Sequence, residues 1–439
     1  AELNLTASLV NDLDRDGFGD EAAPHYNHLW TQMFRRIADA AAGAAADYPE
    51  ADLYRHPFFV KMLKAHRHLI LPGQTTAAIG DSGQTGVPEL VGEVQDAVDD
   101  YERTGDPDFA LLAWRLNGKS WDGLRDSLFS EDPEGVADRI RTEVQKAQPQ
   151  EQSVHLGGFG YAALHGTDGE SERALWMYYG RNDRHGHRDT LNIGLHAFGF
   201  DLAPDLGYPE HADNSPHRHH WVKHTVSHNT VLVDRSMQRN SLGGEPLHYV
   251  CGRTVRMFEA HAPEVYPHTS MYRRCAASIG GEDGVGGDEY WVDFFRVAGG
   301  REHHYSFHGP SGEAEVRGVE LVAQPHGTAA GPEFPYGVPG DADPQDSPNA
   351  YRGSGFHYLT NVERSAHAVE GVFAAEWRVP SSDVRLRATM LGSYDEVMFA
   401  DGIPPRNKPG NPPRLRYMLV SRAAKDADAE LCSQFVAVL

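Results

Sequence analysis

The feature that most constrains the fold is a change in hydrophobic period near residue 150. Before this point apolar residues recur every three or four positions, whereas after it they alternate with polar residues. A spacing of three to four gathers side chains on one face of a helix, and a spacing of two gathers them on one face of a strand. The chain is therefore predicted to be an α+β protein of two domains, a helical domain at 1–150 and an antiparallel β-sheet domain at 151–439.

Residues 1–150 are predicted to form a stack of antiparallel helices. The first helix is expected at 26–46, where apolar residues lie three or four positions apart, and Pro24 suits the start of a helix. The apolar residues of this amphipathic pattern are Trp30, Met33, Phe34, Ile37 and Ala41. Further helices are expected at 57–69, 88–101, 108–117 and 134–145.

Residues 151–439 are predicted to form an antiparallel β-sandwich. Alternating runs at 159–164 and 174–179 flank a turn rich in Gly, Asp and Glu, which is the pattern of a β-hairpin. No long helical pattern separates the later runs, so a parallel sheet with crossover helices is not expected. Further strands are expected at 191–198, 230–234, 254–259, 290–297, 304–308, 374–379 and 415–421.

Charge and composition exclude several classes of protein. The 40 Lys and Arg residues against 63 Asp and Glu give a net charge of −23, and no long basic patch interrupts it, so a nucleic-acid partner is not expected. No window approaches the roughly 18 consecutive apolar residues of a membrane helix, so we expect no membrane span. Three cysteines are too few for a disulfide scaffold, although one bridge between Cys251 and Cys275 stays open.

Histidine is concentrated in one part of the β half. Nine of the 25 histidines fall within 55 residues, where an even spread would place about three. If Arg184-His-Gly-His-Arg-Asp189 begins a strand, His185, His187 and Asp189 share one face. Neutral imidazole and carboxylate oxygen are the usual ligands of zinc apart from sulfur, so the cluster fits either a metal site or a hydrated surface. Further ligands from neighbouring strands would be Asp205 and His228.

Two motifs resemble known sites but lack a required part. Asp12-Leu-Asp-Arg-Asp-Gly17 copies the first half of an EF-hand calcium loop, but Ala23 occupies the twelfth position, where the loop needs a bidentate carboxylate. Gly80-Asp-Ser-Gly83 resembles a fragment of serine proteases, yet it lies between predicted helices and lacks the glycine expected next. Neither motif is expected to be a functional site.

Several segments, taken in their order along the chain, resemble those of the heparinase II/III-like polysaccharide lyases. The His-Gly-His segment is also closely similar to that of the oligoalginate lyases, and the whole resemblance runs from about residue 11 to 310. It implies an incomplete (α/α) toroid followed by antiparallel β-sheets, with a saccharide cleft between them. The matching segments are 16–27, 184–195, 204–207 and 228–234.

The resemblance implies β-elimination of a uronic-acid-containing glycan, a glycosaminoglycan or alginate, to an unsaturated uronate. Tyr26 matches the catalytic tyrosine of the family, which serves as acid and, for one epimer, also as base. His185 matches a histidine that is an alternative base or stabilises charge in the cleft. Arg181, Asn182 and Arg184 are close to His185 in sequence and are expected to bind substrate.

The resemblance also implies a metal ion, usually zinc, held by His187, Asp205 and His228. This ion would organise the β domain beside the cleft rather than activate water. One family feature is missing: an Asn-Asn-His-Gly-like segment that neutralises the substrate carboxylate has no counterpart before Asp16. Local cations, not the net charge, decide whether a polyanion binds. A basic path is expected from Arg35, Arg36, Lys61, Lys64, Arg67 and Arg184.

Two other functions stay open. A glycan-binding protein of the same fold without catalysis would accommodate the missing segment, and it would retain glycan without forming a double bond. A zinc hydrolase would lose turnover on metal removal and form no unsaturated product. The chain opens at Ala1 without Met or an apolar signal segment, which fits a processed export protein or a fragment, so a secreted or periplasmic location is expected. No pattern in the sequence indicates an oligomeric state.

Overall fold

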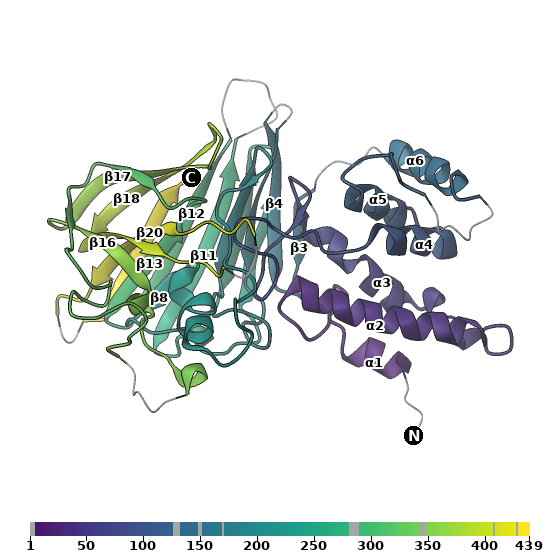
Figure 1. Cartoon of the computed structure of the whole chain (residues 1–439), viewed down its shortest axis with the longest axis horizontal. Helices are drawn as coiled ribbons and strands as arrows, with labels where there is room; N and C mark the ends of the chain where they lie inside the picture. Colours follow the sequence, from purple (N-terminus) through teal and green to yellow (C-terminus); the bar gives the residue numbers. More distant parts are fainter. Residues whose placement is uncertain are drawn as a thin grey trace.

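The chain folds into a helical part and a larger β part, which occupy the two ends of the molecule with β3 and β4 at their boundary (Figure 1). The α+β class and the antiparallel sheets are confirmed, whereas the toroid and the domain boundary near residue 150 stay predictions. No helix in the described part of the chain is long and apolar enough to cross a membrane. The computed structural model describes residues 5–125, 132–147, 152–168, 171–280, 289–341, 347–406, 409–426 and 429–439.

The helical part contains the predicted helices and one short helix that was not predicted, α1. Helix α4 begins six residues later than expected because Gly92 has a φ of +130°, outside the helical region. A two-stranded sheet, β1 (Ile70–Leu71) with β2 (Thr75–Thr76), follows α3. The helices are α1 (Leu5–Asn11), α2 (Pro24–Ala42), α3 (Pro57–Ala65), α4 (Val94–Thr104), α5 (Pro107–Leu116) and α6 (Gly135–Ala147).

Helix α2 buries a face that is rotated away from the one that its apolar residues predicted, although Phe34 still packs against the core. Met33 and Ile37 are 62% and 44% exposed, whereas Thr31 and Arg35 are buried. The buried guanidinium is paired, because Arg35 donates hydrogen bonds of 2.7 and 2.5 Å to the two carboxylate oxygens of Asp100. Buried charges are tolerated when they are paired in this way. The helix was therefore predicted correctly and its inward face was not.

A five-stranded antiparallel sheet of order β3-β4-β5-β6-β7 lies against the helices. Both of its faces are covered: Trp176 packs in a core shared with the helical part, and the adjacent Leu175 packs in the core shared with the other sheets. The predicted hairpin is confirmed as β4 and β5, which pair from Tyr161 with Tyr178 onward. The strands are β3 (Val154–Leu156), β4 (Tyr161–Asp168), β5 (Ser171–Tyr178), β6 (Asn192–Ala197) and β7 (Phe200–Asp201).

An eight-stranded antiparallel sheet contributes one face to the largest core. Its order is β14-β17-β18-β21-β12-β11-β10-β9, so the last strand of the chain lies in its interior between β18 and β12. The strands are β9 (Glu245–Cys251), β10 (Val255–His261), β11 (Thr269–Ile279), β12 (Tyr290–Gly299), β14 (Ala314–Arg317), β17 (Val369–Arg378), β18 (Arg385–Tyr394) and β21 (Cys432–Val438).

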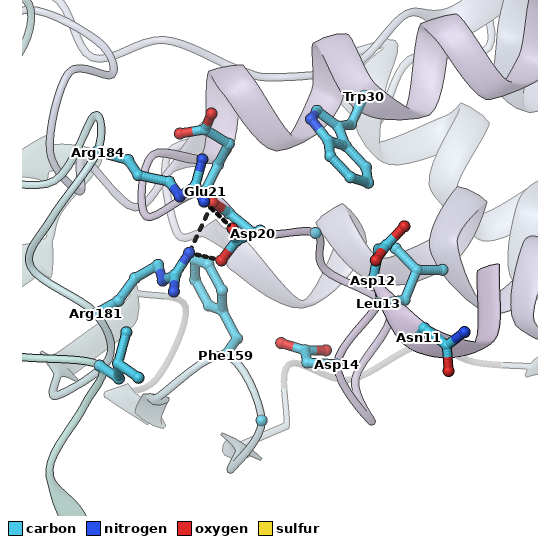
Figure 2. Close-up of a pocket in the computed structure, with 13 residues that line it drawn as sticks. Asn11, Asp12, Leu13, Asp14, Asp20, Glu21, Trp30, Phe159, Arg181 and Arg184 are labelled. Carbon is cyan, nitrogen blue, oxygen red and sulfur yellow. Dashed lines mark hydrogen bonds and ion pairs between the residues drawn. The ribbon is translucent and has the colours of Figure 1, made fainter. Parts of the chain in front are cut away.

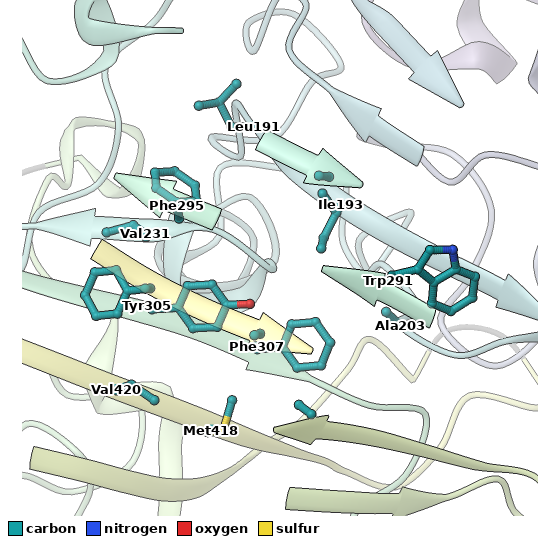
Figure 3. Packing of buried hydrophobic residues seen from close by; sticks show 14 of the residues in the cluster. Leu191, Ile193, Ala203, Val231, Trp291, Phe295, Tyr305, Phe307, Met418 and Val420 are labelled. Atoms are coloured by element: carbon teal, nitrogen blue, oxygen red, sulfur yellow. The ribbon is translucent and has the colours of Figure 1, made fainter. Parts of the chain in front are cut away.

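A six-stranded antiparallel sheet of order β15-β16-β19-β20-β13-β8 contributes the facing side of this core. In Figure 3, Phe295 of the eight-stranded sheet lies above Tyr305 and Phe307, with Met418 and Val420 below them. The strands are β8 (Val231–Val233), β13 (Glu302–His308), β15 (Leu321–Ala323), β16 (Leu359–Ser365), β19 (Glu396–Gly402) and β20 (Leu415–Ala423).

The sheets fix the ends of two loops through a buried ion pair. Arg274 donates hydrogen bonds of 2.8 and 2.7 Å to Asp293, and neither side chain is exposed. The same guanidinium donates to the carbonyl oxygens of Leu191, at 2.6 Å, and of Asn229. Asn229 directly follows His228, so this pair holds in place the two segments that carry the predicted metal-binding histidines.

The bridge between Cys251 and Cys275 is not formed, and all three cysteines are free. Cys251 pairs with Arg256 and Cys275 pairs with Glu259, so the two cysteines lie on opposite sides of β10. Two strand spacings alone amount to roughly 9–10 Å, and Arg256 and Glu259 are also three positions apart along β10, so the separation exceeds the roughly 7 Å between Cα atoms that a disulfide can span.

Candidate functional site

Tyr26 and His185 come from different halves of the chain and lie in contact. Tyr26 is in the first turn of α2, and His185 is in the loop between β5 and β6. Their rings stack with centroids 3.5 Å apart and an interplanar angle of 5°. The phenol of Tyr26 donates a hydrogen bond of 3.4 Å to the Tyr208 oxygen. The fold thus places one phenol and one imidazole side by side where the helical and β parts meet.

Glu21 and the loop at Gly80 orient His185. The Glu21 carboxylate lies 2.7 Å from His185 Nδ1, and assigning the proton to this nitrogen leaves Nε2 with a free lone pair. The Asp81 amide donates a hydrogen bond of 2.8 Å to the His185 carbonyl oxygen. Gly80 has a φ of +60°, and a Cβ there would lie 2.3 Å from that oxygen, so this close approach requires glycine.

The phenol of Tyr26 is held in its protonated form. Burial raises the pKa of Tyr26, and the hydrogen bond with Tyr208 and the charge of Asp81 raise it further, whereas Arg218 lowers it. A phenol with a pKa above its ordinary value carries its proton at neutral pH. In this state Tyr26 can donate a proton to a reacting group.

Residues 184–189 form a loop, so the condition that they begin a strand, on which His185, His187 and Asp189 would share a face, is not met. Arg184 has a φ of +53°, and the Gly186 amide donates a hydrogen bond of 2.8 Å to the Asp183 carbonyl, which makes a turn. Consequently Asp189 does not share a face with the two histidines. Its carboxylate accepts a hydrogen bond of 3.2 Å from the Asn192 side chain.

The structure brings together the three predicted metal ligands, His187, Asp205 and His228. One ligand atom from each lies within 4.8 Å of the others. The His187 and His228 side chains are 0% exposed and that of Asp205 is 1% exposed. All three residues lie on loops rather than on the neighbouring strands that were expected. An ion at this point would therefore crosslink three loops.

The donor set fits a cation. His228 Nδ1 donates a hydrogen bond of 2.8 Å to the His224 carbonyl, and His187 Nε2 lies 3.2 Å from the Asp81 carboxylate. With these protons assigned, His187 Nδ1 and His228 Nε2 present lone pairs to each other at 2.9 Å. Asp205 Oδ2 is buried without a hydrogen-bond partner. Two imidazole nitrogens and a carboxylate oxygen are a usual donor set for zinc.

The electrostatics of the cluster of His187, Asp205 and His228 also favour a bound cation. Burial would lower the pKa of His187, but the carboxylates of Asp205 and Asp81 raise it to about 9. Burial would likewise raise the pKa of Asp205, but His228 and His187 hold it well below its usual range. The carboxylate is therefore charged, and the cluster favours a compensating positive charge at its centre.

Asp81 is a residue that the sequence analysis set aside with its Gly-Asp-Ser-Gly motif. Its carboxylate is 1% exposed, and it accepts hydrogen bonds from His187 and, at 2.9 Å, from Arg218. A carboxylate behind a metal-binding imidazole fixes the tautomer and the direction of the ring. The Gly-Asp-Ser-Gly motif therefore contributes Asp81, which orients His187, and Gly80, which allows the close approach of the His185 carbonyl. It does not act as a serine nucleophile.

Replacing Asp81 by Asn is expected to weaken zinc binding by about 10- to 100-fold, because His187 loses the acceptor that fixes its tautomer. The measurement is competition for zinc with a chelator of known affinity. Asp39→Asn is the matched control, since Asp39 is an exposed carboxylate that pairs with Arg103. An Asp81→Asn protein with the wild-type zinc affinity would contradict the assignment.

The predicted substrate-binding residues have different surroundings. Asn182 is 0% exposed, and its amide is hydrogen-bonded to Thr190, Arg239 and Ser241, so its side chain is not available to a ligand. Arg181 and Arg184 both pair with Asp20 beside a pocket of ≈ 670 Å³ (Figure 2). Carboxylates also line this pocket, which is therefore not simply basic. They are Asp12, Asp14, Asp20 and Glu21.

Most of the expected basic path is neutralised by ion pairs. Arg35 pairs with Asp100, Lys64 pairs with Asp106 and Asp108, and Arg67 also pairs with Asp108. A cation that already has a carboxylate partner offers little to a second anion. The prediction that these cations form a basic path along α2 and α3 is therefore wrong for the paired residues.

The residues that sequence reasoning missed are Glu21, Asp81, Tyr208 and Arg218. Glu21 and Tyr208 could have been found from the sequence, because each lies within five positions of a predicted site residue, Tyr26 and Asp205 respectively. Arg218 lies in a short π-helical turn, Arg218–Val222, and no motif points to it.

Comparison with known proteins agrees with this description. Residues 176–322 match the family model described as Heparinase II/III-like, C-terminal. This segment contains the His-Gly-His loop and all three residues of the metal cluster. No curated protein matches the chain.

Solved structures share the fold. A heparan sulfate lyase HepC from Pedobacter heparinus has 12% sequence identity and a TM-score of 0.57, and the match covers 99% of this chain and 54% of that one. The heparinase III-BT4657 gene product has 14% identity and a TM-score of 0.55, with coverages of 99% and 54%. Another heparinase III structure has 13% identity and a TM-score of 0.53, with coverages of 99% and 56%. The chain thus spans about half the length of these proteins, and its resemblance to the heparinase II/III-like superfamily is confirmed.

Proposed function

We propose that the chain is a polysaccharide lyase that cleaves a uronic-acid-containing glycan by β-elimination. The observation that carries the proposal is the contact between Tyr26, whose phenol is kept protonated by its surroundings, and His185, whose ring is oriented by Glu21. The match of the β part to the heparinase II/III-like C-terminal domain supports it. The helical part contributes Tyr26 and the β part contributes His185, so both are required.

Elimination needs a base for the proton at C5 and an acid for the glycosidic oxygen that leaves C4. The proton beside the uronate carboxylate is weakly acidic, so the negative charge formed on its removal must be stabilised. His185 serves as the base, because Glu21 accepts a hydrogen bond from its Nδ1–H and the lone pair of Nε2 stays free. Tyr26 serves as the acid, because its raised pKa keeps the phenol protonated. The electron pair of the broken C5–H bond then forms the C4–C5 double bond, the electron pair of the C4–O bond leaves with the glycosidic oxygen, and Tyr26 protonates that oxygen.

We also propose that the cofactor is zinc, held by His187, Asp205 and His228. When bound, the ion supplies a fixed positive charge that ties together three loops beside His185. A zinc hydrolase would need an open coordination position and a nearby general base. Ligands that are at most 1% exposed favour a structural ion instead.

The proposed substrate is a glycosaminoglycan or alginate, and the proposed location is secreted or periplasmic. The similar solved structures are a heparan sulfate lyase and heparinase III, which makes a glycosaminoglycan the first candidate. Polymers of this size and charge do not cross membranes freely, so an enzyme that degrades them meets them outside the cytoplasm.

The test is to mix the protein with heparan sulfate, hyaluronan, chondroitin sulfate and alginate and to follow the ultraviolet absorbance of the unsaturated product. We expect a rise with at least one glycan. His185→Ala is expected to lower this rate by at least about 100-fold, because the base is lost. His367→Ala is the control, since His367 is exposed in the turn between β16 and β17.

A flat trace from all four glycans with folded, zinc-loaded protein would contradict the proposal. Retention of a glycan without a new double bond would instead favour a non-catalytic glycan-binding protein. An unchanged rate for His185→Ala would remove His185 from the reaction.

A further inference from the structure

Three cations on segments that pack together near the loop of His185 form no ion pair with a carboxylate in the described part of the chain. Arg188 donates to the backbone and side-chain oxygens of Asn182, and Lys223 donates to the Arg184 carbonyl at 3.0 Å. Arg352 donates to two backbone carbonyls of its own loop, at 2.9 and 2.6 Å. Within the part of the chain that the structure describes, no Asp or Glu lies within ion-pair distance of any of the three.

Hydrogen bonds hold the three segments that carry these cations against one another. The Arg188 amide donates to the Lys223 carbonyl at 2.8 Å. His224, which follows Lys223, donates from Nε2 to the Gly353 carbonyl at 2.9 Å, and Gly353 follows Arg352. The bond from Lys223 to the Arg184 carbonyl places this group one residue from His185. The cations therefore gather at the catalytic loop itself.

Lys223 is deeply buried, and two neighbouring cations act on it. Burial lowers the pKa of Lys223 to about 8; Asp81 and Asp183 oppose this effect, and Arg218 and Arg188 add to it. Like charges that lie close together favour an anion between them.

This arrangement differs from the other cations near the site. Arg181 and Arg184 both pair with Asp20, and Arg218 pairs with Asp81. The chain as a whole has 63 acidic and 40 basic side chains, so carboxylates to neutralise a cation are abundant. Three neighbouring cations that form no ion pair with a described carboxylate are therefore able to bind an anion from outside the protein.

We infer that Arg188, Lys223 and Arg352 form a binding site for an oxyanion, a sulfate or carboxylate group carried by a sugar residue next to the one that is cleaved. This inference rests on the proposed function, since it takes its ligand from the acidic glycan. The site would hold the chain of the glycan in register with Tyr26 and His185. It would also supply positive charge where the expected carboxylate-neutralising segment has no counterpart.

The test measures binding rather than turnover. The full chain carrying Tyr26→Phe, which leaves the ligand intact, is titrated calorimetrically with a heparosan hexasaccharide and with its N-sulfated form. Arg188→Gln and Arg352→Gln are each expected to weaken binding about tenfold, the loss of one charge-assisted hydrogen bond. Arg188→Lys keeps the charge and is expected to bind more tightly than Arg188→Gln. Arg253→Gln is the control, because Arg253 is an exposed arginine in the turn between β9 and β10.

The two ligands identify the anion. A loss confined to the N-sulfated hexasaccharide assigns the site to sulfate, and an equal loss for both assigns it to the uronate carboxylate. Wild-type affinity in both arginine variants, or no binding of either ligand, overturns the inference. Because the wild-type elimination assay is separate, cation-dependent binding without unsaturated product would leave this site standing and remove the proposed lyase function.

Discussion

Tyr26→Phe is expected to lower the rate of elimination by about a thousandfold while the protein stays folded. The substitution keeps the ring that stacks on His185 and removes only the phenolic oxygen, which is the proposed proton donor. General acid catalysis contributes about 10²- to 10⁴-fold, so a large loss is expected even with binding intact. The measurement is the initial rate of ultraviolet absorbance on the best glycan of the panel.

Two observations separate this loss from misfolding. Tyr48→Phe is the matched control, because Tyr48 is 61% exposed and makes no contact with the site. The thermal unfolding temperature of Tyr26→Phe should also remain close to that of the wild type, since the hydrogen bond to Tyr208 is long, at 3.4 Å. A Tyr26→Phe protein with full activity would exclude the phenol from the reaction.

Asp205→Asn is expected to reduce zinc affinity by at least about 100-fold, because the loss of a ligand exceeds the effect of losing an outer hydrogen bond. The carboxylate supplies the negative charge of the cluster, and its Oδ2 has no other hydrogen-bond partner. The zinc content of protein dialysed against a chelator gives one measurement. The other is thermal unfolding, because zinc should raise the unfolding temperature of the wild type and not that of the variant.

Asp201→Asn is a close control for this experiment. Asp201 also lies near a histidine, with its Oδ1 3.6 Å from His196 Nε2, and it is four positions from Asp205 in the sequence. It is not a member of the metal cluster, so this variant should keep the wild-type zinc content. Stoichiometric zinc in Asp205→Asn, or none in the wild type under saturating zinc, would contradict the proposed metal site. Neither measurement depends on enzymatic activity.

The sequence by itself determined the α+β class and most of the helices and strands, and its resemblance to a known family singled out the three residues of the proposed metal site. These features are local or nearly so. Hydrophobic spacing reports which secondary structure a segment adopts, and the motifs around His187, Asp205 and His228 mark their positions one by one. The hairpin of β4 and β5 was predictable for the same reason, since its two strands are adjacent in the chain.

The tertiary structure alone decided which faces are buried and which charges are paired. The apolar residues of α2 indicated a helix, yet its polar face turns inward because Asp100, from another helix, neutralises Arg35. Likewise Asp20 neutralises Arg181 and Arg184, while no carboxylate among the described residues forms an ion pair with Arg188. Periodicity describes a segment relative to its own axis. Burial and ion pairing depend on segments that are far apart in the sequence and meet only in the folded chain.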